Sequence, residues 1–318
     1  MPSVSLVTDG REAPDAFLAK AMAGESGGAA RMWVANHLFE RDPVSLAALA
    51  LGATRRLPAA LMAVSPFTMH PVQAAMIAAT LDEVYPGRVS LSLGVGAPVD
   101  LASAGVEAPR PIAPMRDAIT IIRALLAGET VQYEGRKFSV RGRALASGAR
   151  QVPILLAASG PQMLELAGEV ADGVLISAGT SVEFVHWSLE HVRRGAAGRP
   201  VRACGLVFAA TDADREVAHA RLRRPLAVVL RGAHHRMNLD LAGTVLDQEA
   251  LGAAAARGDW AAAEAMITPQ VLAHHAVCGT PADVRERIAA YHAAGIEEVV
   301  LSGPRDGAQA AALLDATK

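Results

Sequence analysis

The sequence predicts an α/β protein built as one (β/α)8 TIM barrel. Three observations support this fold: the 318 residues suffice for one large α/β domain, short aliphatic runs alternate eight times with longer helical patterns, and 52% of the residues are hydrophobic although only 4% are aromatic. Strands that alternate with helices run parallel and are joined by right-handed crossovers. Eight such units at this length favour a closed barrel, with an open doubly wound sheet as the alternative.

Each expected strand is a short aliphatic run that precedes a helical pattern. The strands are expected at residues 4–7, 31–36, 57–65, 88–96, 152–159, 172–177, 201–210 and 296–303. The helices that follow them are expected near residues 13–23, 43–52, 71–84, 112–127, 161–170, 181–196, 212–223 and 307–316. Each strand of the barrel is therefore followed by a helix on its outer side.

Two segments interrupt this alternation. Residues of about 128–150 form an insertion after the fourth strand, with a predicted hairpin that turns at Glu134-Gly135. Its apolar residues alternate with polar ones: Val131, Tyr133, Phe138 and Val140. Residues 225–280 are mostly helical and hold no clear strand, so they form a helical insertion before the eighth strand. No linker or repeat is evident, and we expect residues 1–318 to form a single domain.

Charge and composition argue against several classes of protein. A net charge of −2 shows no excess of basic residues of the kind that binds nucleic acid. No window of about 18 apolar residues predicts a membrane span. The N-terminus lacks the pattern of a signal peptide. Cys204 and Cys278 are far apart, which argues against a disulfide framework and fits a reducing compartment. We therefore expect a cytoplasmic protein that acts on a small-molecule substrate.

The histidines divide into two kinds. The pairs His234-His235 and His274-His275 are poorly placed to chelate one metal, because neighbours on a helix point about 100° apart. With no cysteine or carboxylate at ligand spacing, we expect packed or solvated histidines and no metal site. His37 differs, because it directly follows the strand at 31–36 and would point into the barrel mouth. There it could donate a hydrogen bond or titrate near neutral pH, with a structural loop histidine as the alternative.

Small residues follow the expected strands at the C-terminal end of the barrel, where the chemistry of this fold lies. They are Asn36, Val64, Ser65, Gly94, Val95, Gly96, Ala158, Ser159, Gly160, Ser177, Ser302 and Gly303. Such residues let a flat or bulky ligand press against the backbone. The run that starts at Gly94 is not a dinucleotide fingerprint, because its sixth position is Val99 and Pro98 interrupts the helix that the motif requires.

The corner at Ser159-Gly160-Pro161 is the most specific of these features. Pro161 suits the first position of a helix, and Gly160 or Ser159 would be the N-cap. Gly160 lacks a Cβ atom, and free amides at a helix start attract phosphate. The corner is interpreted as a phosphate site, with a plain strand-to-helix turn as the alternative.

These segments together resemble a known family. The runs "WVANHLFERDP", "LMAVSPFTMHP", "RVSLSLGVG" and "PILLAASGPQMLELAGEVADGVLIS" are similar to the bacterial-luciferase-like oxidoreductases. Within that superfamily the chain resembles most the coenzyme F420-dependent methylenetetrahydromethanopterin reductases, and the later "GD…ITPQ…CGTP" arrangement strengthens that likeness. The resemblance covers residues of about 30–304. It implies hydride transfer between a reduced deazaflavin and an electrophilic carbon or imine, and a homodimer or higher homo-oligomer.

The resemblance also implies roles for individual residues. His37, with Asn36 beside it, corresponds to the family position that contacts the ring or the reacting centre. The stretch Met62, Ala63, Val64 and Ser65 corresponds to a bulge with a non-proline cis peptide behind the ring. The residues expected to approach the cofactor ring or its tail are Gly94, Val95 and Gly96. Those expected to hold its phosphate are Ala158, Ser159, Gly160 and Ser177, and Ala157 and Pro161 are also expected in the cofactor site.

The chain departs from the family pattern at two positions. Asn36 stands where the family usually has aspartate, and the first strand lacks the glutamate of the methanopterin reductases, with Asp9 nearby at a shifted position. The general acid is therefore left unassigned. The alternatives are an FMN-dependent monooxygenase of the same fold, a reductase that uses a nicotinamide directly, and a barrel that binds flavin without turnover.

Overall fold

A closed ring of eight parallel strands forms the centre of the molecule, which confirms the predicted TIM-barrel fold. The computed structural model describes residues 2–318. The ring runs in the order β1, β2, β3, β4, β7, β8, β9 and β11, and the pairings of β9 with β8 and of β11 with β1 close it. The strands are β1 (Ser3–Thr8), β2 (Met32–Ala35), β3 (Ala59–Val64), β4 (Val89–Leu93), β7 (Ile154–Ala158), β8 (Gly173–Ile176), β9 (Arg202–Thr211) and β11 (Glu298–Ser302).

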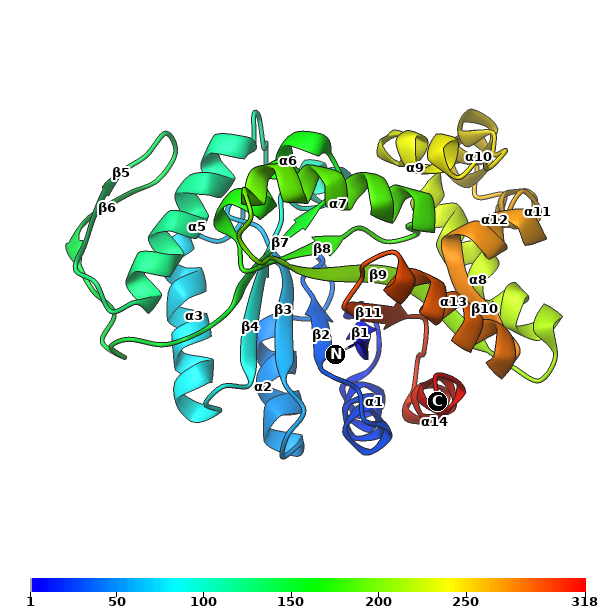
Figure 1. The fold of residues 1–318 in the computed structure, drawn as a ribbon, viewed down its shortest axis with the longest axis horizontal. Coiled ribbons are helices and arrows are strands. Elements are labelled where there is room, and N and C mark those ends of the chain that lie inside the picture. The colour runs from blue at the N-terminus through cyan, green and yellow to red at the C-terminus, as the bar shows by residue number, and fades with distance from the viewer. Residues whose placement is uncertain (1) are drawn as a thin grey trace.

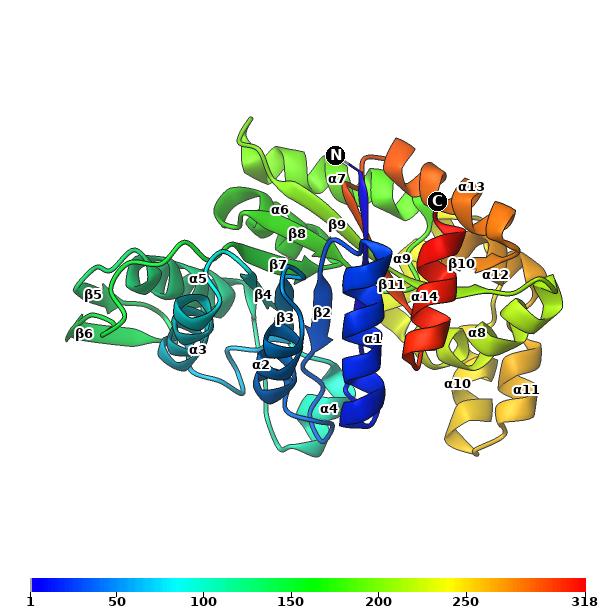
Figure 2. The ribbon, with the colours of Figure 1, turned by 90° about the horizontal axis from the view of Figure 1, so that it is seen from below.

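Helices cover the outside of this ring (Figure 1). They are α1 (Pro14–Gly27), α2 (Pro43–Ala53), α3 (Pro71–Val84), α5 (Ile112–Leu126), α6 (Pro161–Val170), α7 (Val182–Ala196), α8 (Arg215–Leu230), α13 (Pro281–Ala293) and α14 (Gly307–Ala316). Many begin with proline, whose fixed φ suits the first helical turn. α1 and α14 lie side by side, so the chain's two ends meet on one flank (Figure 2).

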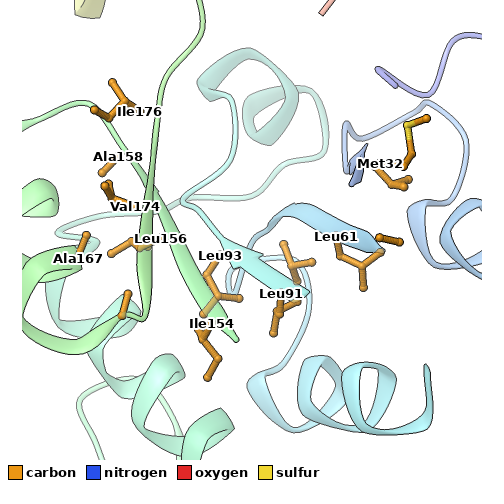
Figure 3. Close-up of a cluster of buried hydrophobic side chains, with 14 of the residues drawn as sticks. Met32, Leu61, Leu91, Leu93, Ile154, Leu156, Ala158, Ala167, Val174 and Ile176 are labelled. Atoms are coloured by element: carbon orange, nitrogen blue, oxygen red, sulfur yellow. The ribbon is translucent and has the colours of Figure 1, made fainter. Parts of the chain in front are cut away.

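The alternation of side chains along the strands separates the outer core from the barrel interior. Figure 3 shows the outer core, in which apolar side chains from β2, β3, β4, β7 and β8 pack together and against α6. The labelled residues are Met32, Leu61, Leu91, Leu93, Ile154, Leu156, Ala158, Ala167, Val174 and Ile176. The alternate residues face inward and form a smaller apolar cluster that includes Trp33, Met62 and Leu155.

A buried carboxylate lies at the N-terminal end of the ring. Glu298 has no exposed surface, and it accepts hydrogen bonds from the Ser5 hydroxyl at 2.6 Å and from Trp33 Nε1 at 2.8 Å. The guanidinium groups of Arg31 and Arg202 lie 3.0 and 2.8 Å from its two oxygens. A charge this deeply buried needs polar partners, and these side chains supply them at the N-terminal end of the ring.

The first insertion is the predicted hairpin. β5 (Val131–Glu134) and β6 (Ser139–Arg143) pair in antiparallel fashion, with the turn at Gly135 as expected. The hydroxyl of Tyr133 donates to Asp117 of α5 at 2.8 Å, and the amide of Lys137 donates to the other oxygen of Asp117 at 3.1 Å. These bonds hold the hairpin tip against α5 (Figure 1).

The second insertion differs from one expectation. It is mostly helical, with a 3-10 turn (Ala233–His235), α9 (Arg236–Leu241), α10 (Gln248–Ala256), α11 (Trp260–Ala265) and α12 (Pro269–His275). It also holds a strand, β10 (Ala276–Gly279), which pairs in parallel with the far end of β9. The prediction that no strand lies in 225–280 was wrong, because four residues that include one alanine and one glycine give no recognisable strand pattern.

Two helices also differ from expectation. α8 continues through Pro225 to Leu230, because its apolar face packs into the insertion, where Leu222 and Leu226 are buried. A short helix that was not expected, α4 (Pro98–Ser103), follows β4. Within residues 2–318, no helix combines the length and the apolar character that a bilayer crossing requires.

The helices α6 and α7 approach at backbone distance through two glycines. A Cβ atom built on Gly168 would lie 2.1 Å from the carbonyl oxygen of Val192, and one on Gly195 would lie 1.9 Å from that of Glu165. Because backbone atoms cannot yield, only glycine fits at these two positions. This contact fixes α6, whose first turn faces the open end of the barrel.

We expect Gly168→Ala to lower the free energy of unfolding by about 1–3 kcal/mol, because the added methyl group overpacks the contact. Gly252→Ala is the matched control: Gly252 lies in α10, and a Cβ atom there meets nothing within 4 Å. The free energy of unfolding of Gly252→Ala is expected to rise by about 0.5–1 kcal/mol, because alanine has the higher helix propensity. Urea denaturation checks both values, and equal effects of the two substitutions would refute the close-contact explanation.

Candidate functional site

The polar residues after β2, β3 and β4 gather around one small cavity at the C-terminal end of the barrel. The cavity has a volume of about 10 Å³, enough for about one water molecule. Its lining includes four predicted site residues: Asn36, Ala63, Ser65 and Gly96. The lining also includes Asp100 of α4, which sequence reasoning missed.

His37 lies at the edge of this group. Its side chain is 47% exposed, and its Nδ1 atom lies 3.6 Å from a carboxylate oxygen of Asp100. An Nδ1–H that faces a carboxylate leaves Nε2 as the nitrogen available to a ligand. The amide of its neighbour Asn36 donates to the carbonyl of Met62, which joins the end of β2 to β3. His37 and Asp100 therefore form a polar pair that a small ligand can reach.

The end of β3 has the irregular backbone that the resemblance implies. The peptide bond between Met62 and Ala63 is cis, and the pairing of β3 with β4 shifts between Leu61 and Val64. The Val64 side chain is buried in the outer core. The hydroxyl of Ser65 donates to the carbonyl of Val95 at 2.6 Å, which ties this bulge to the loop after β4.

Gly94 lies where β3, β4 and β7 come together. A Cβ atom on Gly94 would lie 2.7 Å from the Cβ atom of Ala63 and 3.5 Å from that of Ala157. Ala63 and Ala157 are partly exposed, and both pack on the inward-facing cluster. Gly94 itself is buried, so only the two alanines offer exposed surface here, between the β2–β4 side of the mouth and the β7–β8 side.

The corner after β7 is open, as expected of a site for a phosphate. Pro161 is the first residue of α6 and Gly160 its N-cap, and no side chain within residues 2–318 caps this helix. A Cβ atom on Gly160 would meet nothing within 4 Å, and Ser159 is partly exposed. The first amides of a helix have no carbonyl partner within it, so those of Gln162 and Met163 are available to an anion.

On the β7–β8 side of the mouth, Ala158 offers only its main chain to a ligand, and Ser177 lies in a loop. The Ala158 side chain points into the outer core, so only its main chain can reach a ligand (Figure 3). Ser177 directly follows β8 and is partly exposed, and its carbonyl accepts a hydrogen bond from the Thr180 hydroxyl.

The second insertion fixes the loop that starts at Ser177. His275 Nδ1 lies 2.8 Å from the carbonyl of Gly179 and must donate to it, while the Thr244 hydroxyl lies 2.9 Å from Nε2. Asn238 donates to the same Gly179 carbonyl at 2.7 Å. The neutral imidazole fits this arrangement, with Nδ1 as donor and Nε2 as acceptor, and burial lowers the pKa of His275 to about 4. The expectation of a packed histidine is confirmed for this residue.

A buried ion pair follows β1 and was not foreseen. Lys20 of α1 is almost fully buried and pairs with Glu12, whose other oxygen accepts the hydroxyl of Thr8. Lys20 also donates to the carbonyl of Val7 at 3.2 Å. The first strand itself lacks a glutamate, as the sequence indicates. Glu12, in the loop that follows the strand, nevertheless brings a carboxylate into contact with Thr8 at the strand's end. With both oxygens engaged, Glu12 holds this loop in place.

The possible metal ligands and the thiols of residues 2–318 can be assessed from their positions. No cluster of three or more histidine, cysteine, aspartate or glutamate side chains there could hold a metal ion. Cys204 and Cys278 are both free, and burial raises the pKa of each thiol to about 12. Neither is therefore a thiolate near neutral pH.

Comparisons with known proteins agree with the fold. Residues 2–298 match the family model described as luciferase-like monooxygenase. The 5,10-methylenetetrahydromethanopterin reductase of Archaeoglobus fulgidus is 31% identical over 291 residues, which span 88% of this chain and 87% of the relative. The coenzyme F420-dependent tetrahydromethanopterin reductase of Methanopyrus kandleri superposes with a TM-score of 0.91 at 23% identity, over 98% of this chain and 97% of that one. An F420-dependent secondary alcohol dehydrogenase superposes with a TM-score of 0.81 at 18% identity, over all of both chains.

We expect acid to destabilise the protein through His275. Its folded pKa of about 4 lies below the value of about 6.5 for an unfolded histidine, so the unfolded chain binds protons first as the pH falls. The contribution is complete above about pH 6.5, and at pH 5 on the order of 2 kcal/mol of it is lost.

Urea denaturation of the wild type and of His275→Gln at pH 7.5 and pH 5 measures the contribution of His275 to the loss of stability in acid. The variant is expected to lose about 2 kcal/mol less than the wild type over this interval. His186→Gln on the exposed face of α7 serves as the control and keeps the wild-type dependence. An unchanged dependence in His275→Gln would refute the neutral, buried imidazole.

Proposed function

Since the chain belongs to the luciferase-like monooxygenase family, we propose that it is an oxidoreductase that uses coenzyme F420. The proposed reaction transfers a hydride between the reduced deazaflavin and an electrophilic carbon or imine, as in a methylenetetrahydromethanopterin reductase. The observation that carries the proposal is the close contact of the buried Gly94 with Ala63 and Ala157, at the same end of the barrel as the polar pair of His37 and Asp100. A homo-oligomeric state and a cytoplasmic setting remain predictions.

A tricyclic ring would lie over the mouth and not inside it, because the cavity among these residues holds only about one water molecule. Gly94 is buried and leaves no room for a Cβ atom beside Ala63, so the side chains that would face the ring at this point are those of Ala63 and Ala157. Gly160 faces open space at the first turn of α6, where amides are available to a phosphate. In the proposed complex Met62, Ala63, Val64 and Ser65 lie behind the ring, and Ala158 and Ser159 contribute main-chain groups at the phosphate.

The protein supplies position and polarity, and the bound deazaflavin in its reduced form supplies the hydride. His37 would orient the acceptor through Nε2, because Nδ1 faces Asp100. With its ring oriented by Asp100, His37 would deliver a proton to an atom that gains negative charge. Asn36, which lines the cavity, would orient the same group. The apolar interior beneath Met62 keeps water from the reacting face.

A thermal-shift panel with coenzyme F420, FMN, NADH and NADPH tests the choice of cofactor. A ligand that binds only the folded state raises the melting temperature by mass action. We expect a saturable shift with F420 and a much smaller one with the other three.

One other candidate has a specific basis. The matched family is described by its monooxygenases, so an FMN-dependent reaction with oxygen is the second proposal. A selective shift with FMN, together with oxygen consumption, would replace the first proposal with this one.

We expect His37→Ala to lower kcat by about 100-fold or more, since loss of a general acid typically costs 10²–10⁴-fold. The affinity for F420 changes by less than about threefold, because an exposed imidazole adds little binding energy. His186→Ala is the control for loss of an exposed histidine. Stopped-flow absorbance and fluorescence titration measure the two quantities, and an unchanged kcat would remove His37 from the chemistry.

A further inference from the structure

One aromatic side chain lies uncovered at the mouth of the barrel, in the turn that contains His37. Phe39 is 74% exposed, and no other phenylalanine, tyrosine or tryptophan within residues 2–318 is more than partly exposed. We propose that Phe39 is a specificity-determining residue, whose ring packs on the organic body of the hydride acceptor and favours acceptors with a flat, apolar substituent. The inference rests on the proposed function and deepens it, because it names a class of substrate for the same site.

The backbone at Phe39 has a conformation that a bulky residue rarely adopts. The amide of Glu40 donates to the carbonyl of His37 at 3.3 Å, which closes a tight turn with Phe39 in its third position. The φ angle of Phe39 is 69°, in the left-handed region that favours glycine or asparagine. Phenylalanine here costs the free protein both backbone strain and exposed apolar surface, and the fold compensates little of either because the ring is mostly uncovered. Such a residue is typical of a position where a ligand covers the ring.

The turn that carries Phe39 is attached to the loop after β1. The carboxylate of Glu40 accepts a hydrogen bond from Arg11 Nε at 3.0 Å. The guanidinium of Arg41 donates to the carbonyls of Gly10 and Arg11 at 3.2 and 2.9 Å. These bonds give the turn a defined position before a ligand binds, which lowers the entropy that binding would otherwise cost.

Phe39 follows β2, on the side of the mouth away from the phosphate corner. In the ring of strands β2 is the neighbour of β3, and both β3 and β4 separate it from β7. In the proposed complex the cofactor ring covers Ala63 and Ala157, and its tail leaves toward Gly160 after β7. The turn after β2 is therefore placed for the acceptor and not for the tail of the cofactor.

Exposed apolar side chains flank both members of the polar pair. Phe39 lies two residues after His37, and Val99, which directly precedes Asp100 in α4, is 62% exposed. Leu38 lines the small cavity together with Asp100. The polar pair would meet the reacting atoms of an acceptor, while the apolar side chains would contact its substituent. An aromatic ring gains stacking in addition to apolar burial, so an aryl substituent is favoured over a short alkyl group.

The test compares two cyclic imines that differ in one substituent on the imine carbon, phenylpyrroline and methylpyrroline. Calorimetry measures their binding to the full-length protein loaded with oxidised F420, which cannot donate a hydride. We expect phenylpyrroline to bind the wild type about tenfold or more tightly than methylpyrroline. Phe39→Asn is expected to abolish this advantage and to change the affinity for methylpyrroline by less than about twofold, because asparagine keeps the turn. Phe39→Tyr retains the aromatic face and is expected to retain the advantage.

The melting temperature separates this role from a structural one. Phe39→Asn is expected to melt at or above the temperature of the wild type, because asparagine tolerates the left-handed backbone better than phenylalanine does. Val84→Ala is the matched control, since Val84 is 61% exposed at the end of α3. The control removes exposed apolar surface elsewhere and is expected to keep the wild-type preference for phenylpyrroline.

Equal affinity of the two imines for the wild type, no binding of either imine, or an equal loss for both in Phe39→Asn would overturn the role of Phe39 while the proposed function stands. A changed oligomeric state of Phe39→Asn with unchanged imine affinities would also overturn it, and would assign the ring to a contact between copies of the chain. Failure of F420 to bind, seen beforehand in its fluorescence, would overturn the choice of F420 and the role of Phe39 together.

Discussion

The site depends on the absence of side-chain volume at one point of the barrel mouth. A Cβ atom on Gly94 would lie 2.7 Å from the Cβ atom of Ala63, closer than two such atoms can approach without displacement. This position joins the irregular end of β3 to β7, and hence the polar pair of His37 and Asp100 to the corner at Gly160. A larger residue at Gly94 would separate the two halves of the site.

The rest of the fold keeps this small-residue surface in place. At the N-terminal end of the ring, Glu298 and its arginine partners fill the interior. At the other end, Lys20 and Glu12 fix the loop after β1, and the second insertion fixes the loop after β8 through Asn238 and His275. Buried polar groups of this kind are costly unless every partner is present, so they define single conformations for loops that would otherwise vary.

Much of the fold could be predicted from the sequence, because strand and helix periodicity are local properties. The eight-unit barrel and the hairpin at Glu134-Gly135 were predicted correctly. The missed elements were short or held by tertiary contacts. β10 has only four residues, and α8 passes Pro225 because its apolar face is buried in the insertion.

The site was only partly accessible to sequence reasoning. Small residues after strands mark the mouth, so Asn36, Ala63, Ser65 and Gly96 were expected near one another and lie around one cavity. Asp100 was missed because it contacts His37 from α4, a helix whose six residues give little periodic signal. Glu12 was missed because only the folded loop brings it back to Thr8. The roles of these residues toward a ligand stay predictions.

The most direct test of the proposed binding mode is a crystal structure of the protein with oxidised coenzyme F420. The account predicts that the tricyclic ring lies against Ala63, Gly94 and Ala157, and that the phosphate contacts the amides at Gly160 and Gln162. A ring bound elsewhere, or a phosphate turned away from the start of α6, would contradict it.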